Sequence, residues 1–469
     1  MDSRGQAVPK SAGRRWAWMA VLGTFAGLAW RQNRFIHRYA VNMMYWDHWD
    51  MYQPFFHRKY WWDLFTFQFG PQLQGVGFLL TRALAGLSGW NSRWEAFGIH
   101  YTLAAAALIA LLVCRRCGVR PVLALIAVPL LFFNAHEIGD FVAASDLSHG
   151  AMPVLLIVLY LAAWLLHDYR ARLAAHAFLT FLLVFTGFGW VAALVAPALA
   201  GAEAVQAWRA AERPRAACCL AAFAAMLGSW VLFFRYFRID RMSYPPMQYY
   251  RGEPHRYLEF ASLMIANFYG LPPRVLPSIV FGTAVLALLA FLVVWHALKI
   301  RRAGLARAPG HAAVFFLSAY ALLYCALTAA GRLQLGLDQA PAASRYVTLL
   351  IPAALAPLLH LGTVRRRGAG ALAVLYALCL VPATVHRSAR ERATIAWYHD
   401  GRSAWRTAYL ATHSEAEADR MSHFQVYPGS VAGRLDFLER HRLNLFHGVP
   451  PAGTPAPSAV PGRPASASR

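Results

Sequence analysis

Long runs of apolar residues recur along this chain and alternate with short polar segments. A helix needs roughly 20 apolar residues to cross a bilayer, and the runs lack the alternation that barrel strands show. We therefore predict an all-α integral membrane protein with about eleven transmembrane helices. The predicted crossings cover residues 16–30, 94–113, 121–133, 151–166, 177–186, 191–205, 219–234, 279–298, 312–330, 347–361 and 370–385.

Two parts of this pattern need separate interpretation. The first run follows a basic N-terminus, as a signal peptide does, but no small-residue cleavage site separates it from Arg31 and Arg34. We interpret it as an uncleaved signal anchor. The fifth and sixth crossings are short and are separated only by residues 187–190. One long tilted helix is the alternative for this pair.

The basic residues predict the orientation. Each proposed inner segment carries two to four Lys or Arg residues, whereas the three short outer loops contain only Arg332 and Arg345. Lys and Arg are retained on the cytoplasmic side, so we predict a multi-pass inner-membrane protein with a cytoplasmic N-terminus and a periplasmic C-terminus. Much of the net charge of +23 has the same cause, and we expect no nucleic-acid partner.

The polar segments divide the chain further. Residues 1–385 form the predicted multi-span domain, residues 386–448 a small outer-face C-terminal segment, and residues 449–469 a tail. The tail is mostly Pro, Ala, Ser and Gly, which predicts disorder.

Two long outer loops interrupt the multi-span domain, at residues 31–93 and 235–278. Each contains an apolar stretch that is too short to span, at residues 76–87 and 257–268. Helical spacing of the apolar positions favours interfacial helices in both loops.

The first outer loop contains a pair of acids, Asp47 and Asp50, among Trp and Tyr residues. Carboxylates at i and i+3 share one face of a helix, and one of them close to the outer surface could take a proton from a hydroxyl. The alternative is an aromatic belt at the interface with solvated acids.

The second outer loop is short and rich in titratable residues, namely His136, Glu137, Asp140, Asp146 and His149. Its acids, with Asp47 and Asp50, could hold a divalent cation, although the sequence does not identify a metal. A polar loop exposed to water is the alternative.

Arg345 begins a predicted crossing on the outer side, and Arg332 ends the previous one. A planar guanidinium suits a phosphate group. An arginine that extends toward the lipid headgroups is the alternative for Arg345.

Taken together, the chain resembles the GT-C superfamily of membrane glycosyltransferases, and more narrowly a poorly characterised family of bacterial multi-span proteins. The resemblance rests on a W-D-x-W-D-like motif at residues 46–50, on G-R-x-x-x-G-x-x-Q-A…S-R-Y at residues 331–346, and on a Leu-x-x-Phe-like stretch at residues 443–446. One departure lies at residues 67–72, where such proteins carry an Asn-Glu-His-Arg-like run and this chain has F-Q-F-G-P-Q.

The resemblance implies transfer of a sugar from a polyprenyl-phosphate donor to a glycan or lipid acceptor on the outer face. Asp47 or Asp50 would deprotonate the acceptor, and Arg345 with Arg332 would stabilise the departing lipid phosphate. A lipid-linked glycan flippase or other transporter, and an inactive scaffold, are the alternatives. Transporters place ionisable groups near the bilayer midplane, whereas the acids here concentrate in outer loops.

Overall fold

The computed structural model describes residues 10–57, 59–241, 252–273, 275–338, 346–364 and 368–448. Almost all regular structure in these ranges is helical. The described strands are the two-residue β1 (Gln68–Phe69) and β2 (Gln72–Leu73), which pair in antiparallel fashion within the first outer loop. The predicted all-α class is confirmed.

Six helical segments of the described chain are long and apolar enough to cross a membrane. A seventh candidate is a pair of helices bent by 46°, α18 (Ala369–Val385) and α19 (Ala389–Thr412). These helices indicate a multi-pass membrane protein. The six are α6 (Arg93–Arg116), α10 (Gly189–Arg209), α11 (Arg213–Tyr236), α13 (Leu276–Ala303), α14 (Pro309–Arg332) with η5 (Leu333–Leu335), and α16 (Tyr346–Leu349) with α17 (Ile351–Thr363).

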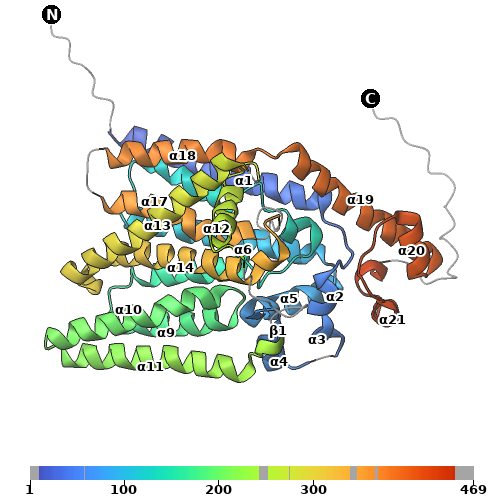
Figure 1. Cartoon of the computed structure of the whole chain (residues 1–469), viewed down its shortest axis with the longest axis horizontal. Coiled ribbons are helices and arrows are strands. Elements are labelled where there is room, and N and C mark those ends of the chain that lie inside the picture. Colours follow the sequence, from blue (N-terminus) through green and yellow to red (C-terminus); the bar gives the residue numbers. More distant parts are fainter. Residues whose placement is uncertain are drawn as a thin grey trace, which may run out of the picture.

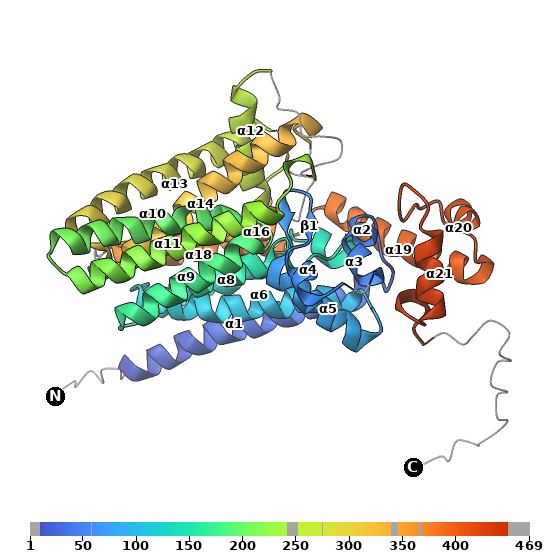
Figure 2. The same cartoon turned by 90° about the horizontal axis from the view of Figure 1, so that it is seen from below.

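Further helices lie alongside these six in the same bundle (Figures 1 and 2). They pack on α6, on α10 and on one another. They are α1 (Lys10–Tyr39), η1 (Val122–Ile126), α7 (Ala127–Phe132), α8 (Ala151–Ala163) and α9 (Tyr169–Phe185). We call the end of the bundle where α1 begins the near end, and the end where α1 finishes the far end.

The α9–α10 connection settles the alternative raised for residues 177–205. Two separate helices are present, joined by Thr186, Gly187 and Phe188. Gly187 has a φ of +52°, and a Cβ there would lie 1.7 Å from the backbone oxygen of Ser148. Only glycine fits this conformation at this distance, so the chain turns sharply here and the single tilted helix is excluded.

The first outer loop and the C-terminal segment lie together at the far end (Figure 2). They share one hydrophobic cluster, in which Trp49, Phe55, Trp405 and Leu435 are at most 2% exposed. The C-terminal segment is therefore packed onto the first loop. The elements here are α2 (Asp47–Met51), α3 (Gln53–Phe56), α4 (Trp61–Phe65), α5 (Gly75–Ser88), α20 (Glu415–Ser422), α21 (Ala432–Arg440) and η6 (Asn444–Phe446).

Both predicted loop helices exist, as α5 and as α12 (His255–Phe268). The predicted location of the apolar face of α12 is corrected, because Phe260, Met264 and Phe268 are at most 1% exposed. That face packs on α13 and α14 rather than lying in the membrane interface. In α5, Phe78 is buried and Leu87 is 80% exposed. The remaining short elements are η2 (Gly139–Ala143), η3 (Ile239–Arg241) and η4 (Leu305–Arg307).

Candidate functional site

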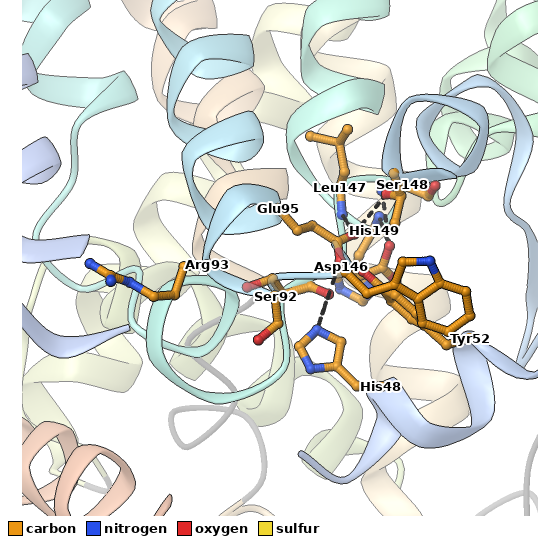
Figure 3. Close-up of polar contacts among 12 residues, drawn as sticks. His48, Tyr52, Ser92, Arg93, Glu95, Asp146, Leu147, Ser148 and His149 are labelled. Carbon is orange, nitrogen blue, oxygen red and sulfur yellow. Dashed lines mark hydrogen bonds and ion pairs between the residues drawn. The ribbon is translucent and has the colours of Figure 1, made fainter. Parts of the chain in front are cut away.

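A buried carboxylate, Glu95, lies at the far end in the first turn of α6 and is 2% exposed. Its Oε1 accepts hydrogen bonds from the Thr81 hydroxyl at 2.7 Å and the Leu147 backbone N–H at 3.3 Å. Its Oε2 accepts one from the Tyr52 hydroxyl at 3.0 Å. In Figure 3, Tyr52 and Glu95 lie close to Asp146, Leu147 and Ser148 of the loop after α7, while Arg93 points away. Glu95 therefore joins the first outer loop, α5 and the second loop.

His48 lies beside this carboxylate, with its Nε2 3.9 Å from Oε2 of Glu95 and 2.7 Å from the backbone oxygen of Ser145. Burial, together with the nearby Arg402 guanidinium, lowers the pKa of His48 to about 4. The imidazole is therefore neutral at neutral pH, and its Nε2–H donates to the Ser145 oxygen.

The predicted second-loop acids are buried, not exposed to water: Glu137, Asp140 and Asp146 are at most 7% exposed. Asp146 Oδ1 accepts from the backbone N–H groups of Ser148 and His149, at 2.9 and 3.0 Å. This local bond shapes the turn before α8.

Glu137 connects the second loop to a later helix. Its Oε1 accepts from the backbone N–H of Asp140 at 3.3 Å, and its Oε2 accepts from the Thr348 hydroxyl of α16 at 2.7 Å. Glu137 and Asp146 thus hold the backbone of this loop in place between α7, α8 and α16. A carboxylate used in this way stabilises a fixed loop conformation.

The first-loop acids lie on one short helix, and Asp50 is tied to the C-terminal segment. The Asp50 side chain, 41% exposed, accepts from the Tyr427 hydroxyl, which lies 2.9 and 3.0 Å from its two carboxylate oxygens, and pairs with Arg434 at 3.2 Å. Asp47 is partly buried at the start of α2. In the described ranges, no group of three His, Cys, Asp or Glu side chains is arranged to hold a metal ion, which gives the proposed cation no support.

Arg402 fixes α19 against the first loop and the short second loop that follows α7. It is 2% exposed, and its guanidinium donates to the backbone oxygens of Val142 at 2.6 Å, of Val41 at 3.0 Å and of Met43. Among the described residues no carboxylate pairs with this buried charge, and several carbonyl dipoles stabilise it by accepting its hydrogen bonds. The position of α19 relative to the first loop is therefore well determined.

A cavity of about 670 Å³ lies between the second loop, the end of α12, the segment after η5, and the start of α19. His136 and Glu391 form part of its wall, with Nδ1 and Oε1 2.5 Å apart. Glu391 also accepts from the backbone N–H of Ser388 at 2.7 Å, which completes the capping box of α19. The other polar lining residues are Asn267, Asp338, His386, Ser388, Arg390, Thr394 and Tyr398.

The predicted phosphate ligands are only partly accounted for. Arg332 is half-buried at the end of α14 and does not belong to the described lining of the cavity. Arg345 lies outside the described residues. Arg390, which the sequence did not single out, is the arginine in the described part of the cavity lining.

Glu95 and Glu391 were also missed. Glu95 did carry a signal, because it is an acid at the boundary of a predicted crossing, next to Trp94. Ionisable residues within membrane-spanning segments are rare and are often functional. Glu391 carried the weaker signal of Ser388 three residues before it, which is typical of a capping box.

No family model, no curated protein and no solved structure matches this chain.

Proposed function

We propose that this protein is a membrane glycosyltransferase of the GT-C type, which moves a sugar from a polyprenyl-phosphate donor to a cell-envelope glycan or lipid acceptor. In this proposal the shorter bundle helices also cross the inner membrane, which brings the count to about eleven. The far end then lies on the periplasmic side, and the N-terminus in the cytoplasm.

The cavity of about 670 Å³ at the far end is the observation that carries the proposal. Its volume falls in the range of small-molecule sites, about 300–1,000 Å³. Arg390 and His386 supply cationic or hydrogen-bonding groups to its lining, and a guanidinium is well suited to a phosphate. The cavity lies at the end of a membrane bundle, where a lipid-borne sugar and an acceptor on the outer face can meet.

Asp47 is the better of the two predicted bases. Tyr398, in the cavity lining, packs on Tyr45 with ring centroids 5.5 Å apart. Burial and the neighbouring Tyr398 raise the pKa of Tyr45 to about 12, and Asp47 contributes to the same rise. Asp47 is thus close to a ring that contacts the cavity wall, and this proximity favours it as the base.

In the proposed reaction, the acceptor oxygen forms a bond to the anomeric carbon as the bond from that carbon to the donor phosphate oxygen breaks. The acceptor proton passes to the Asp47 carboxylate. The lipid phosphate leaves with the electron pair of the broken bond, and Arg390 stabilises its charge. The anomeric configuration inverts because one displacement occurs.

The experiment compares wild type, Asp47→Asn and Asp50→Asn, each purified in detergent, for sugar transfer from a panel of polyprenyl-phosphate hexoses and pentoses. Asn keeps the shape of Asp but cannot accept the proton, so Asp47→Asn is expected to lose about 10²–10⁴-fold in rate. Asp50→Asn is the matched control and is expected to retain transfer.

Two outcomes contradict this proposal at different points. Equal activity of all three proteins would remove Asp47 and move the base to Glu137, Asp140 or Asp146. A well-folded wild type that transfers no sugar from any donor of the panel would refute the glycosyltransferase itself, and would favour the flippase or scaffold alternatives.

A further inference from the structure

A second cavity, of about 1,170 Å³, lies at the near end of the bundle, remote from the site described above. Its walls come from the start of α1, the end of α6, the link to η1, the end of α17 and the start of α18. Four arginines belong to this lining, namely Arg14, Arg115, Arg116 and Arg120.

The described lining carries four positive charges and no negative one. None of its described residues is Asp or Glu, and within the described chain none of the four arginines has a carboxylate partner. Cations at the end of α6 are favoured by the helix dipole, which accounts for Arg115 and Arg116. It does not account for Arg14 and Arg120, which reach the same cavity from α1 and from the link to η1.

Two further features favour an anion that carries apolar chains. Ala369 and Gly370, at the start of α18, line the cavity, and the first turn of a helix presents N–H groups that bind anions. Leu125 and Leu361 provide apolar wall, and Trp18 lies under the Arg115 guanidinium, 5.4 Å from ring centroid to Cζ. The cavity therefore combines a cationic rim with an apolar wall at the end of a membrane bundle.

We propose that this near-end cavity binds the headgroup of an anionic phospholipid from the adjoining leaflet, with its arginines on the phosphates. Four guanidinium groups provide enough charge for a lipid with two phosphates, such as cardiolipin. Basic pockets between membrane helices bind headgroups of this kind. The proposal does not depend on glycosyl transfer, because no residue of the far-end site takes part in it.

The test uses the full chain, purified in a mild detergent with a zwitterionic phospholipid. Cardiolipin is titrated, and its apparent affinity is taken from the shift in Tm. In Arg116→Gln/Arg120→Gln, loss of two arginines is expected to weaken the apparent affinity roughly 30-fold. The matched control is Arg301→Gln/Arg302→Gln, at the exposed end of α13 outside the cavity lining, which is expected to bind as wild type does.

A single variant, Arg14→Gln, covers the case in which the double variant fails to fold, and is expected to bind about 5-fold more weakly. An equal loss in the Arg301/Arg302 control would overturn the proposal, because binding would then reflect general surface charge. Inorganic pyrophosphate that reproduces the Tm shift at the same phosphate concentration would also overturn it, since the site would then take a soluble anion.

Discussion

Replacing Glu95 by Ala tests how the far-end site is held together. The carboxylate accepts three hydrogen bonds from buried donors, the hydroxyls of Tyr52 and Thr81 and the backbone N–H of Leu147. A buried donor that is left without an acceptor lowers the free energy of unfolding by about 1–3 kcal/mol. Because some of the vacated space can admit water, we expect Glu95→Ala to lower the free energy of unfolding by about 3–5 kcal/mol.

Gln is the informative comparison at this position. Its carbonyl oxygen can accept from Thr81 and Leu147, and its amide can donate to the Tyr52 oxygen, so the loss is expected to be about 1 kcal/mol. Glu417→Ala is the surface control, since that carboxylate is 45% exposed and pairs with Arg420 on the same helix, where water and salt screen the pair and leave it little effect on stability.

The assay is thermal unfolding of the purified variants in one detergent, followed by the fluorescence of the buried tryptophans. Glu95→Ala should fall about 5 °C or more below wild type in Tm, while Glu95→Gln and Glu417→Ala stay close to it. If Glu95→Gln were as damaging as Glu95→Ala, the charge of the carboxylate would matter more than its accepted hydrogen bonds, and the reasoning above would be wrong.

Two further outcomes are expected from the same region. Because the folded pKa of His48 is about 4, below the ordinary 6.5, the unfolded chain binds a proton between these pH values that the folded chain does not. Stability should therefore fall as pH drops below about 6.5, by roughly 3 kcal/mol in full, and Tm measured at about pH 7.5 and about pH 5 should differ less in His48→Gln. Tyr427→Phe removes the hydroxyl that donates to the Asp50 carboxylate, and limited proteolysis should cleave its C-terminal segment faster at a stability cost of about 1 kcal/mol. An unchanged cleavage rate would show that this hydrogen bond does not help to hold the segment.

The helical membrane architecture could be predicted because it depends on local composition. A run such as Cys219 to Phe234 has few charges and bilayer length, and the observed α11 contains it. The sequence left open whether α9 and α10 are two helices, and the φ of Gly187 in the structure decides for two. The surroundings of the apolar face of α12 could not be predicted from the sequence. The periodic spacing of apolar residues in an amphipathic helix is the same whether that face contacts lipid or, as here, packs on α13 and α14.

The candidate site was less predictable because its contacts join distant parts of the chain. Asp47 and Asp50 look equivalent in sequence, yet the partners of Asp50, Tyr427 and Arg434, come from more than 370 residues later. Likewise, Glu95 becomes a buried acceptor only through donors from α5, the first loop and the second loop. Periodicity contains no information about such pairings.

The far-end site is built from residues of the N-terminal third of the chain together with residues of α19. Glu391 contacts His136 across the cavity wall, and Arg402 reaches the backbone oxygens of Val41 and Val142. These contacts place α19 against the loops that follow α1 and α7, so the residues before α19 supply only part of the cavity lining. The C-terminal segment therefore belongs to the site itself, because without α19 the cavity would lose Arg390, Glu391 and Tyr398 together.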